Sequence, residues 1–166
     1  MIAQLQKTIE TRLQEALTPA VAVELYPQLV DGMSLPRVAL ELDEFAPGTD
    51  PGNNQLALIA TMQARVILDP NQEDAELLIR QLAARVALEV HRAYGFDLGY
   101  VAPAKIRRLV PDGFSRPELE GYLVWLVEWT HEIDIGDEAD LTVRPGAAGI
   151  DWTVMSGDAE EELVTV

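Results

Sequence analysis

The chain has 166 residues, of which 48% are apolar and 24% charged, and it carries a formal net charge of −16. This length and composition suit one compact core and argue against disorder throughout. The absence of cysteine excludes disulfide scaffolds, thiol nucleophiles and cysteine-ligated zinc, and it fits a reducing cytoplasm.

Periodic apolar residues predict the first three elements. Apolar side chains recur at three- and four-residue steps over residues 2–17, which predicts a helix that ends before Pro19. This stretch lacks an uninterrupted apolar run, so we expect neither a signal peptide nor a membrane span. Residues 20–26 and 36–44 alternate apolar and polar side chains, as half-buried strands do.

A long loop and a long strand are predicted next. Residues 44–54 read EFAPGTDPGNN, and their two Pro-Gly pairs and two asparagines are typical of a loop. Residues 55–69 then alternate throughout, which predicts a strand with its apolar side chains on one face. Four polar residues are expected on the opposite face: Gln55, Thr61, Gln63 and Arg65.

A second helix is predicted after Asp69-Pro70, capped by Asn71 and stopped near Gly95. Acids close to its start suit the positive end of the helix dipole. Its exposed side is expected to hold two ion pairs at i,i+4 spacing, Glu76/Arg80 and Arg85/Glu89. Its buried side is expected to hold six apolar residues: Leu78, Ile79, Leu82, Val86, Val90 and Ala93.

The remaining pattern completes the expected fold. Residues 104–110 (AKIRRLV) predict a short strand, residues 111–118 a turn, and residues 119–135 a long strand. The predicted class is α+β, with a mainly antiparallel sheet, two helices packed against it and the order α-β-β-β-α-β-β. Residues 1–136 are expected to form this domain, and residues 137–166 an acidic C-terminal arm.

Three candidate ligands lie within four positions of the last predicted strand: His131, Glu132 and Asp134. Successive side chains on a strand point to opposite faces. His131 therefore falls in the apolar row with Trp129 and Ile133, while Glu132 and Asp134 face the other way. The three side chains cannot converge on one ion without a bulge, so we expect a structural histidine rather than a metal ligand.

No catalytic signature stands out elsewhere. His91 has no partner at metal-ligand spacing and is expected on the surface of the second helix. The sequence has no nucleophile elbow and no phosphate-binding glycine loop. We therefore expect no enzymatic activity, no catalytic residue, no metal and no cofactor.

Two stretches are candidate protein-binding surfaces. Lys105, Arg107 and Arg108 form the one basic cluster, which either docks an acidic neighbour or is an ordinary solvated strand. A second candidate alternates apolar residues within the arm: Ile150, Trp152 and Val154. Such a strand adds either to its own sheet or to the edge of a neighbour's sheet.

The C-terminal end is strongly acidic. From Trp129 onward, ten acids accompany Arg144 as the one basic residue. Such a field repels nucleic-acid backbones, so a DNA-binding module is disfavoured.

The order of these elements resembles the tail terminator (tail completion) proteins of tailed bacteriophages and prophages. Five stretches within residues 1–135 carry the resemblance, by order and spacing rather than by a sharp motif: IETRLQEALTPAVAVELYP, RVALELDEF, LALIATMQARVILD, AELLIRQLAARVALEVHRAYG and LEGYLVWLVEWTHEID. The acidic arm has no counterpart in this resemblance.

The resemblance implies a structural virion protein rather than an enzyme. It implies a homo-oligomeric ring, typically a hexamer, that caps the tail tube at its head-proximal end after assembly in the host cytoplasm. Expected partners are other copies of the chain, the tail tube protein and a head-completion or connector protein, with no membrane involved. DNA would pass through without specific binding. Two alternatives are another tail tube or head-completion protein, and an acidic DNA mimic that blocks a nucleic-acid enzyme.

Overall fold

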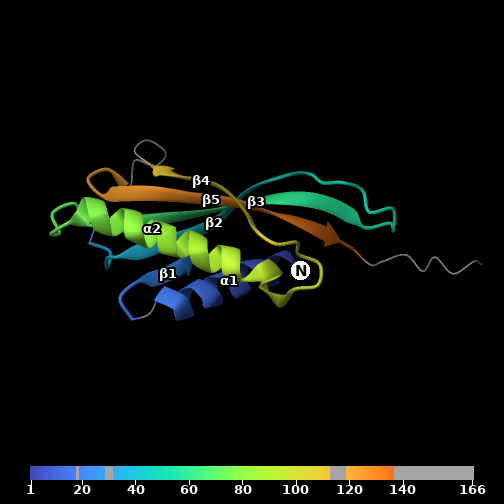
Figure 1. Cartoon of the computed structure of the whole chain (residues 1–166), viewed down its shortest axis with the longest axis horizontal. Coiled ribbons are helices and arrows are strands. Elements are labelled where there is room, and N and C mark those ends of the chain that lie inside the picture. Colours follow the sequence, from blue (N-terminus) through green and yellow to red (C-terminus); the bar gives the residue numbers. More distant parts are fainter. Residues whose placement is uncertain (18, 29–31, 113–118, 137–166) are drawn as a thin grey trace, which may run out of the picture.

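The computed structural model describes residues 1–17, 19–28, 32–112 and 119–136. They form one five-stranded sheet with helices α1 (Ile2–Leu17) and α2 (Ala75–Arg92) on one of its faces (Figure 1). A short 3-10 helix, η1 (Tyr94–Asp97), follows α2. Both helices match the predicted ranges to within a few residues. In the part of the chain that the structure describes, neither helix is long and apolar enough to cross a membrane.

The sheet has the order β1-β2-β3-β5-β4. Its strands are β1 (Ala22–Leu25), β2 (Arg37–Pro47), β3 (Leu56–Leu68), β4 (Lys105–Pro111) and β5 (Leu123–Ile135). β1 runs parallel to β2, and all other neighbours are antiparallel. The predicted α+β class, element order and mainly antiparallel sheet are therefore confirmed.

β2 is longer than predicted, and the loop after it is shorter. Residues 44–47, which we assigned to the loop, continue the strand: Phe45 pairs with Ala60 and Pro47 with Leu58, beyond a bulge between Leu42 and Glu44. β1 covers β2 only as far as Leu40. The distal half of β2 is thus a sheet edge, where proline costs no hydrogen bond.

The start of α2 differs from the expected cap. Asn71 does not cap the helix, because both its backbone NH and its side-chain amide donate to Oδ1 of Asp69, at 2.9 and 3.0 Å. Asp74 precedes the helix instead, in a left-handed conformation with φ of 56° and no side-chain capping bond. The predicted Asn71 cap is wrong because this side chain hydrogen-bonds to Asp69, two residues earlier, instead of to the first turn of the helix.

One of the two predicted ion pairs on α2 is confirmed. Arg80 pairs with Glu76 and also lies over the Trp125 ring, with its guanidinium carbon 5.1 Å from the ring centre. The predicted Arg85/Glu89 pair does not form, because Glu89 pairs with Arg92 at 3.4 Å. Arg85 instead donates to the backbone carbonyl of Ala16, at the end of α1.

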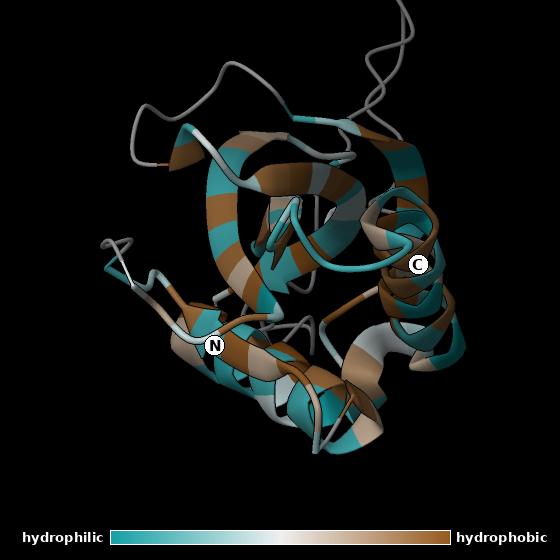
Figure 2. Cartoon of the chain, turned by 90° about the vertical axis from the view of Figure 1, so that its left-hand side faces the viewer, coloured by the Kyte–Doolittle hydropathy of each residue, from teal (hydrophilic) through white to brown (hydrophobic). Residues whose placement is uncertain are grey.

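The core lies between the helices and one face of the sheet. α1 contributes one buried stripe, and β3 contributes the apolar row predicted from its alternation, from Ala60 to Leu68. Of the six α2 residues expected in the core, Ile79, Val86 and Val90 are fully buried and the other three are half-buried against it. Figure 2 shows the resulting alternation of hydrophobic and hydrophilic residues along strands and helices.

Candidate functional site

His131 is completely buried and satisfied by hydrogen bonds. Its Nε2 accepts a hydrogen bond from Nε1 of Trp129 at 3.1 Å, and its Nδ1 lies 2.9 Å from the carbonyl oxygen of Ala102. The indole nitrogen can only donate, so Nε2 must be unprotonated and Nδ1 must carry the proton. Phe96 packs edge-on against the imidazole, with 5.6 Å between ring centres. His131 is therefore a structural histidine, as predicted.

Burial lowers the pKa of His131 below its ordinary value, and the hydrogen bond to the Ala102 carbonyl offsets part of this effect. The two hydrogen bonds have the same consequence as burial. Protonation would put a second donor at Nε2, facing the Trp129 donor. The neutral ring is thus favoured on both grounds.

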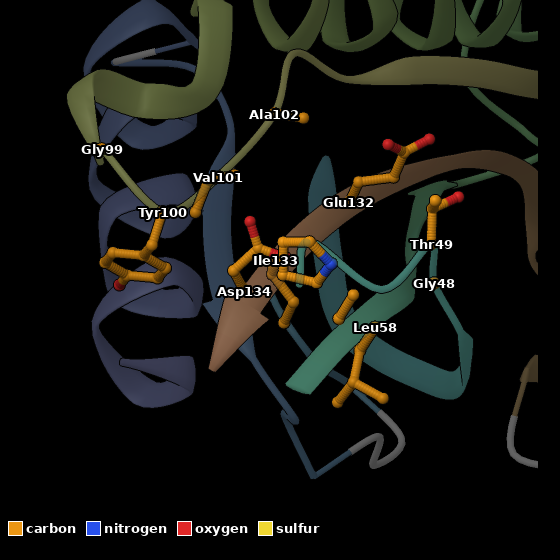
Figure 3. A pocket seen from close by; sticks show the side chains of 12 residues that line it. Gly48, Thr49, Leu58, Gly99, Tyr100, Val101, Ala102, Glu132, Ile133 and Asp134 are labelled. Carbon is orange, nitrogen blue, oxygen red and sulfur yellow. The ribbon is translucent and has the colours of Figure 1, made fainter. Parts of the chain in front are cut away.

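Glu132 and Asp134 point to the opposite face of β5 from His131, as predicted. Glu132 pairs with Lys105 at 2.5 Å, and both side chains are at least half exposed. Both acids line a hollow of about 250 Å³. Their carboxyl groups lie apart from each other (Figure 3). Within the described ranges, no three potential ligands cluster closely enough to hold a metal ion.

The hollow itself is built by residues 99–102 folding against the end of β5. The backbone NH of Ala102 donates to the Glu132 carbonyl at 2.8 Å, and that of Asp134 donates to the Tyr100 carbonyl at 3.2 Å. The Tyr100 hydroxyl reaches α1, 2.8 Å from the Met1 carbonyl, and burial raises the pKa of this phenol. These contacts hold residues 99–102 between the end of β5 and the start of α1.

The predicted basic cluster is largely neutralised within the chain. Lys105 pairs with Glu132, and Arg108 pairs with Glu128 at 2.9 Å. Arg107 lies at a register shift in β4 and is exposed. These pairs favour the ordinary solvated strand over a continuous basic docking patch.

A buried polar network on the helix-free face of the sheet was not anticipated. Arg65 is only 7% exposed and pairs with Glu41 on β2 and with Asp112 after β4, at 2.7 Å for the second pair. Gln63 accepts a bond from Arg65 and donates to Glu128 at 3.0 Å. The sequence placed both residues on this face correctly, but it did not predict their burial. The feature that could have predicted this network is a single arginine in the polar row of β3, next to strands that carry acidic residues.

An apolar groove lies between the start of α2 and the end of β3. It has a volume of about 360 Å³ and combines four apolar residues with a polar rim: Pro36, Leu68, Leu78, Leu82, Gln72, Gln81 and Arg85. The sequence did not reveal it, because Leu78 and Leu82 were both assigned to the core. Both are half-buried and open to this groove.

The other predicted binding residues, Ile150, Trp152 and Val154, lie outside the described residues, as does most of the predicted turn at 111–118. The division into a domain of residues 1–136 and a C-terminal arm stays a prediction.

Comparisons with known proteins give structural likenesses only. No protein-family model and no curated protein matches the sequence. One similar solved structure is the sheath/tube terminator, in its extended state, of an extracellular contractile injection system, PVC. It is 15% identical with a TM-score of 0.49, and the match covers 98% of this chain and 64% of that one.

A second similar structure is the tube-terminating cap of the anti-feeding prophage. It is 13% identical with a TM-score of 0.47, and the match covers 93% of this chain and 62% of that one. The chain therefore spans just under two thirds of the length of each structure. Both TM-scores lie below 0.5, so neither likeness decides what this chain does.

Proposed function

We propose that the chain is a tail terminator: a non-enzymatic subunit that assembles into a ring and ends the tail tube of a phage or a phage-like injection particle. The observation that carries the proposal is an apolar surface at the far end of the sheet. There β2, β3 and β5 run on beyond the helices (Figure 1). Phe45 is 41% exposed and Leu56 60% exposed at this end.

This surface continues the core face of the sheet. Phe45 pairs with Ala60, and Leu56 pairs with Ile135, so their side chains point to the side on which the helices lie. A monomer leaves these apolar groups in water, whereas a neighbouring subunit would cover them. The uncovered end of the sheet thus supports an assembling subunit.

Two exposed leucines lie on the outer side of α2. Leu77 is 56% exposed and Leu88 43% exposed, and eleven positions correspond to three helical turns, so both lie on one side of the helix. Exposed apolar side chains at two different places on one subunit suit head-to-tail contacts, which close into a ring when the rotation between neighbours allows it. We take the sixfold symmetry and the head-proximal position from the resemblance to tail terminators, as part of the same proposal.

The helix-free face of the sheet is compatible with passing DNA. Acids outnumber basic residues on it, and Arg65, Lys105 and Arg108 are all paired with carboxylates. Among the described residues, a face whose cations are mostly paired in this way offers phosphates few free cations to bind. The DNA-mimic alternative is disfavoured on other grounds, because a mimic needs carboxylates spaced like phosphates on one face, whereas the acids of this chain are scattered along the sequence and concentrated at its C-terminal end.

Polymerisation of the cognate tube protein tests the proposal. Added chain should stop tube elongation and bind one tube end, whereas a further tube protein would lengthen tubes. Leu56→Asp should abolish this arrest, because it places a charge in the apolar contact. Thr11→Asp, at an exposed position on α1, is the matched control and should retain it. Unchanged elongation with the wild-type chain would reject the proposal.

A further inference from the structure

The groove beside α2 has no occupant among the described residues, yet it has the properties of a peptide-binding site. Its floor is apolar, formed by Leu68, Leu78 and Leu82, and its volume of about 360 Å³ falls in the range of ligand sites. Gln81 and Arg85 border it and are exposed. An occupant should therefore combine apolar side chains with polar or acidic ones.

We propose that this groove binds the C-terminal segment of a neighbouring copy of the chain, with Ile150, Trp152 and Val154 on its apolar floor. This inference rests on the proposed ring and names the contact that would link its subunits. Two independent features select this occupant: charge, and the place where the segment leaves the domain.

Charge favours an acidic occupant. The guanidinium of Arg85 donates to the neutral carbonyl of Ala16 and, within the described part of the chain, forms no ion pair. Asp151 lies between Ile150 and Trp152 in the sequence, so an extended segment that buries Ile150 and Trp152 turns Asp151 toward the rim. Asp151 and Arg85 are then complementary. Arg12 and Arg107 are also exposed without an ion pair among the described residues, but Arg85 is the arginine that borders this groove.

Distance favours a neighbouring copy over the same chain. Leu68, which lines the groove, pairs with Leu123 at the start of β5, whereas β5 ends at Ile135 beside Leu56. The two ends of this strand are about 40 Å apart. The fifteen residues from Ile135 to Ile150 span at most about 50 Å when fully extended, so reaching the groove of the same subunit would require an almost fully extended path around the helices.

A neighbour removes this constraint. The exit of the segment and the groove lie at opposite ends of the subunit, which is the arrangement of a head-to-tail contact. Repeated around a ring, each subunit would donate one segment and receive one. Burying Trp152 in this way would also cover part of the exposed surface of α2 near Leu77.

Disulfide cross-linking tests the contact directly, because the chain has no native cysteine. One preparation carries Gln81→Cys and another Thr153→Cys; the two are mixed, assembled on tubes and oxidised. We expect a covalent dimer of about twice the chain mass. The matched control pairs Thr153→Cys with Thr11→Cys on α1, and it should give no dimer.

The double variant Gln81→Cys/Thr153→Cys distinguishes the two possible origins of the segment. A ladder of covalent oligomers is expected, whereas a cross-linked monomer would overturn the neighbour and place the segment on its own subunit. Arg85→Glu should lower the yield several-fold, and adding Asp151→Arg should restore it. Failure of this rescue would overturn the charge pairing.

Assembly itself separates failure of this contact from failure of the proposed function. Rings that form and arrest tubes while showing no cross-link would overturn the groove contact and leave the terminator role standing. Chains that neither assemble nor arrest tubes would overturn both.

Discussion

Trp129 and His131 lie two residues apart on the same face of β5, and the indole of one donates to the imidazole of the other at 3.1 Å. The Ala102 carbonyl binds the second ring nitrogen at 2.9 Å. Both side chains are fully buried. His131, a residue type that often binds metals, therefore serves here to connect β5 to the segment after η1.

His131 should make stability depend on pH. Its pKa is lowered in the folded chain, whereas the unfolded chain titrates near pH 6.5. Above about pH 6.5 the ring is neutral in both states, and its contribution is constant. Below that pH the unfolded chain binds a proton that the folded chain does not, so the free energy of unfolding falls as the pH is lowered toward the folded pKa.

Urea unfolding of wild type and His131→Leu at pH 7.5 and pH 5.5 checks this expectation. At pH 7.5 the substitution should cost about 1–3 kcal/mol, because Trp129 Nε1 and the Ala102 carbonyl lose their partner. At pH 5.5 the gap between the two proteins should narrow. A gap independent of pH would contradict a neutral buried imidazole.

Gly95 should not tolerate a side chain. Its φ is +74°, and a Cβ there would lie 2.5 Å from the Val101 carbonyl oxygen. Gly95→Ala should therefore lower stability by at least about 1–2 kcal/mol, measured by thermal or urea unfolding. Gly99→Ala is the control, since Gly99 has open space and an ordinary backbone conformation. Equal effects of the two substitutions would refute the close approach.

The buried Arg65 network should be costly to break. Replacing Arg65 by leucine leaves the half-buried carboxylates of Glu41 and Asp112 without this cation, for which about 3–5 kcal/mol is expected. Arg92→Leu removes an exposed partner of Glu89 and should cost only about 0–1 kcal/mol. Chemical denaturation of both variants makes the comparison. A small loss for Arg65→Leu would mean that the network contributes little.

Deleting residues 137–166 should impair assembly more than folding. The described domain already contains its own core, so the melting temperature of the truncated chain should change little. Its incorporation into tails should fall sharply if the segment joins neighbouring subunits. A truncated chain that melts far lower and still assembles normally would place the segment in its own core.

Alternation along long strands predicted much of the fold. The period of two in β3 placed its apolar row on the core side and Gln63 and Arg65 on the other face, and the same parity separated His131 from Glu132. These predictions succeeded because a single reversal of face would expose an entire row of apolar side chains.

Contacts between distant segments could not be predicted in the same way. The Pro-Gly pair at 47–48 led us to end β2 too early, because proline is disfavoured inside a sheet. β1 is short, so this part of β2 is an edge, where proline is tolerated, and the sequence does not show that. Arg85 has the right spacing for Glu89 but reaches Ala16, which is 69 positions away in the sequence. The burial of Arg65 likewise depends on Asp112, which lies beyond an entire helix and strand.

Cryo-electron microscopy of intact particles carrying a tagged copy of the chain would show where the chain sits and how many copies are present. We expect a closed ring of several copies at one end of the tail tube, with each subunit contacting the next head to tail. A single copy at that end, copies distributed along the tube, or particles that lack the chain altogether would contradict it.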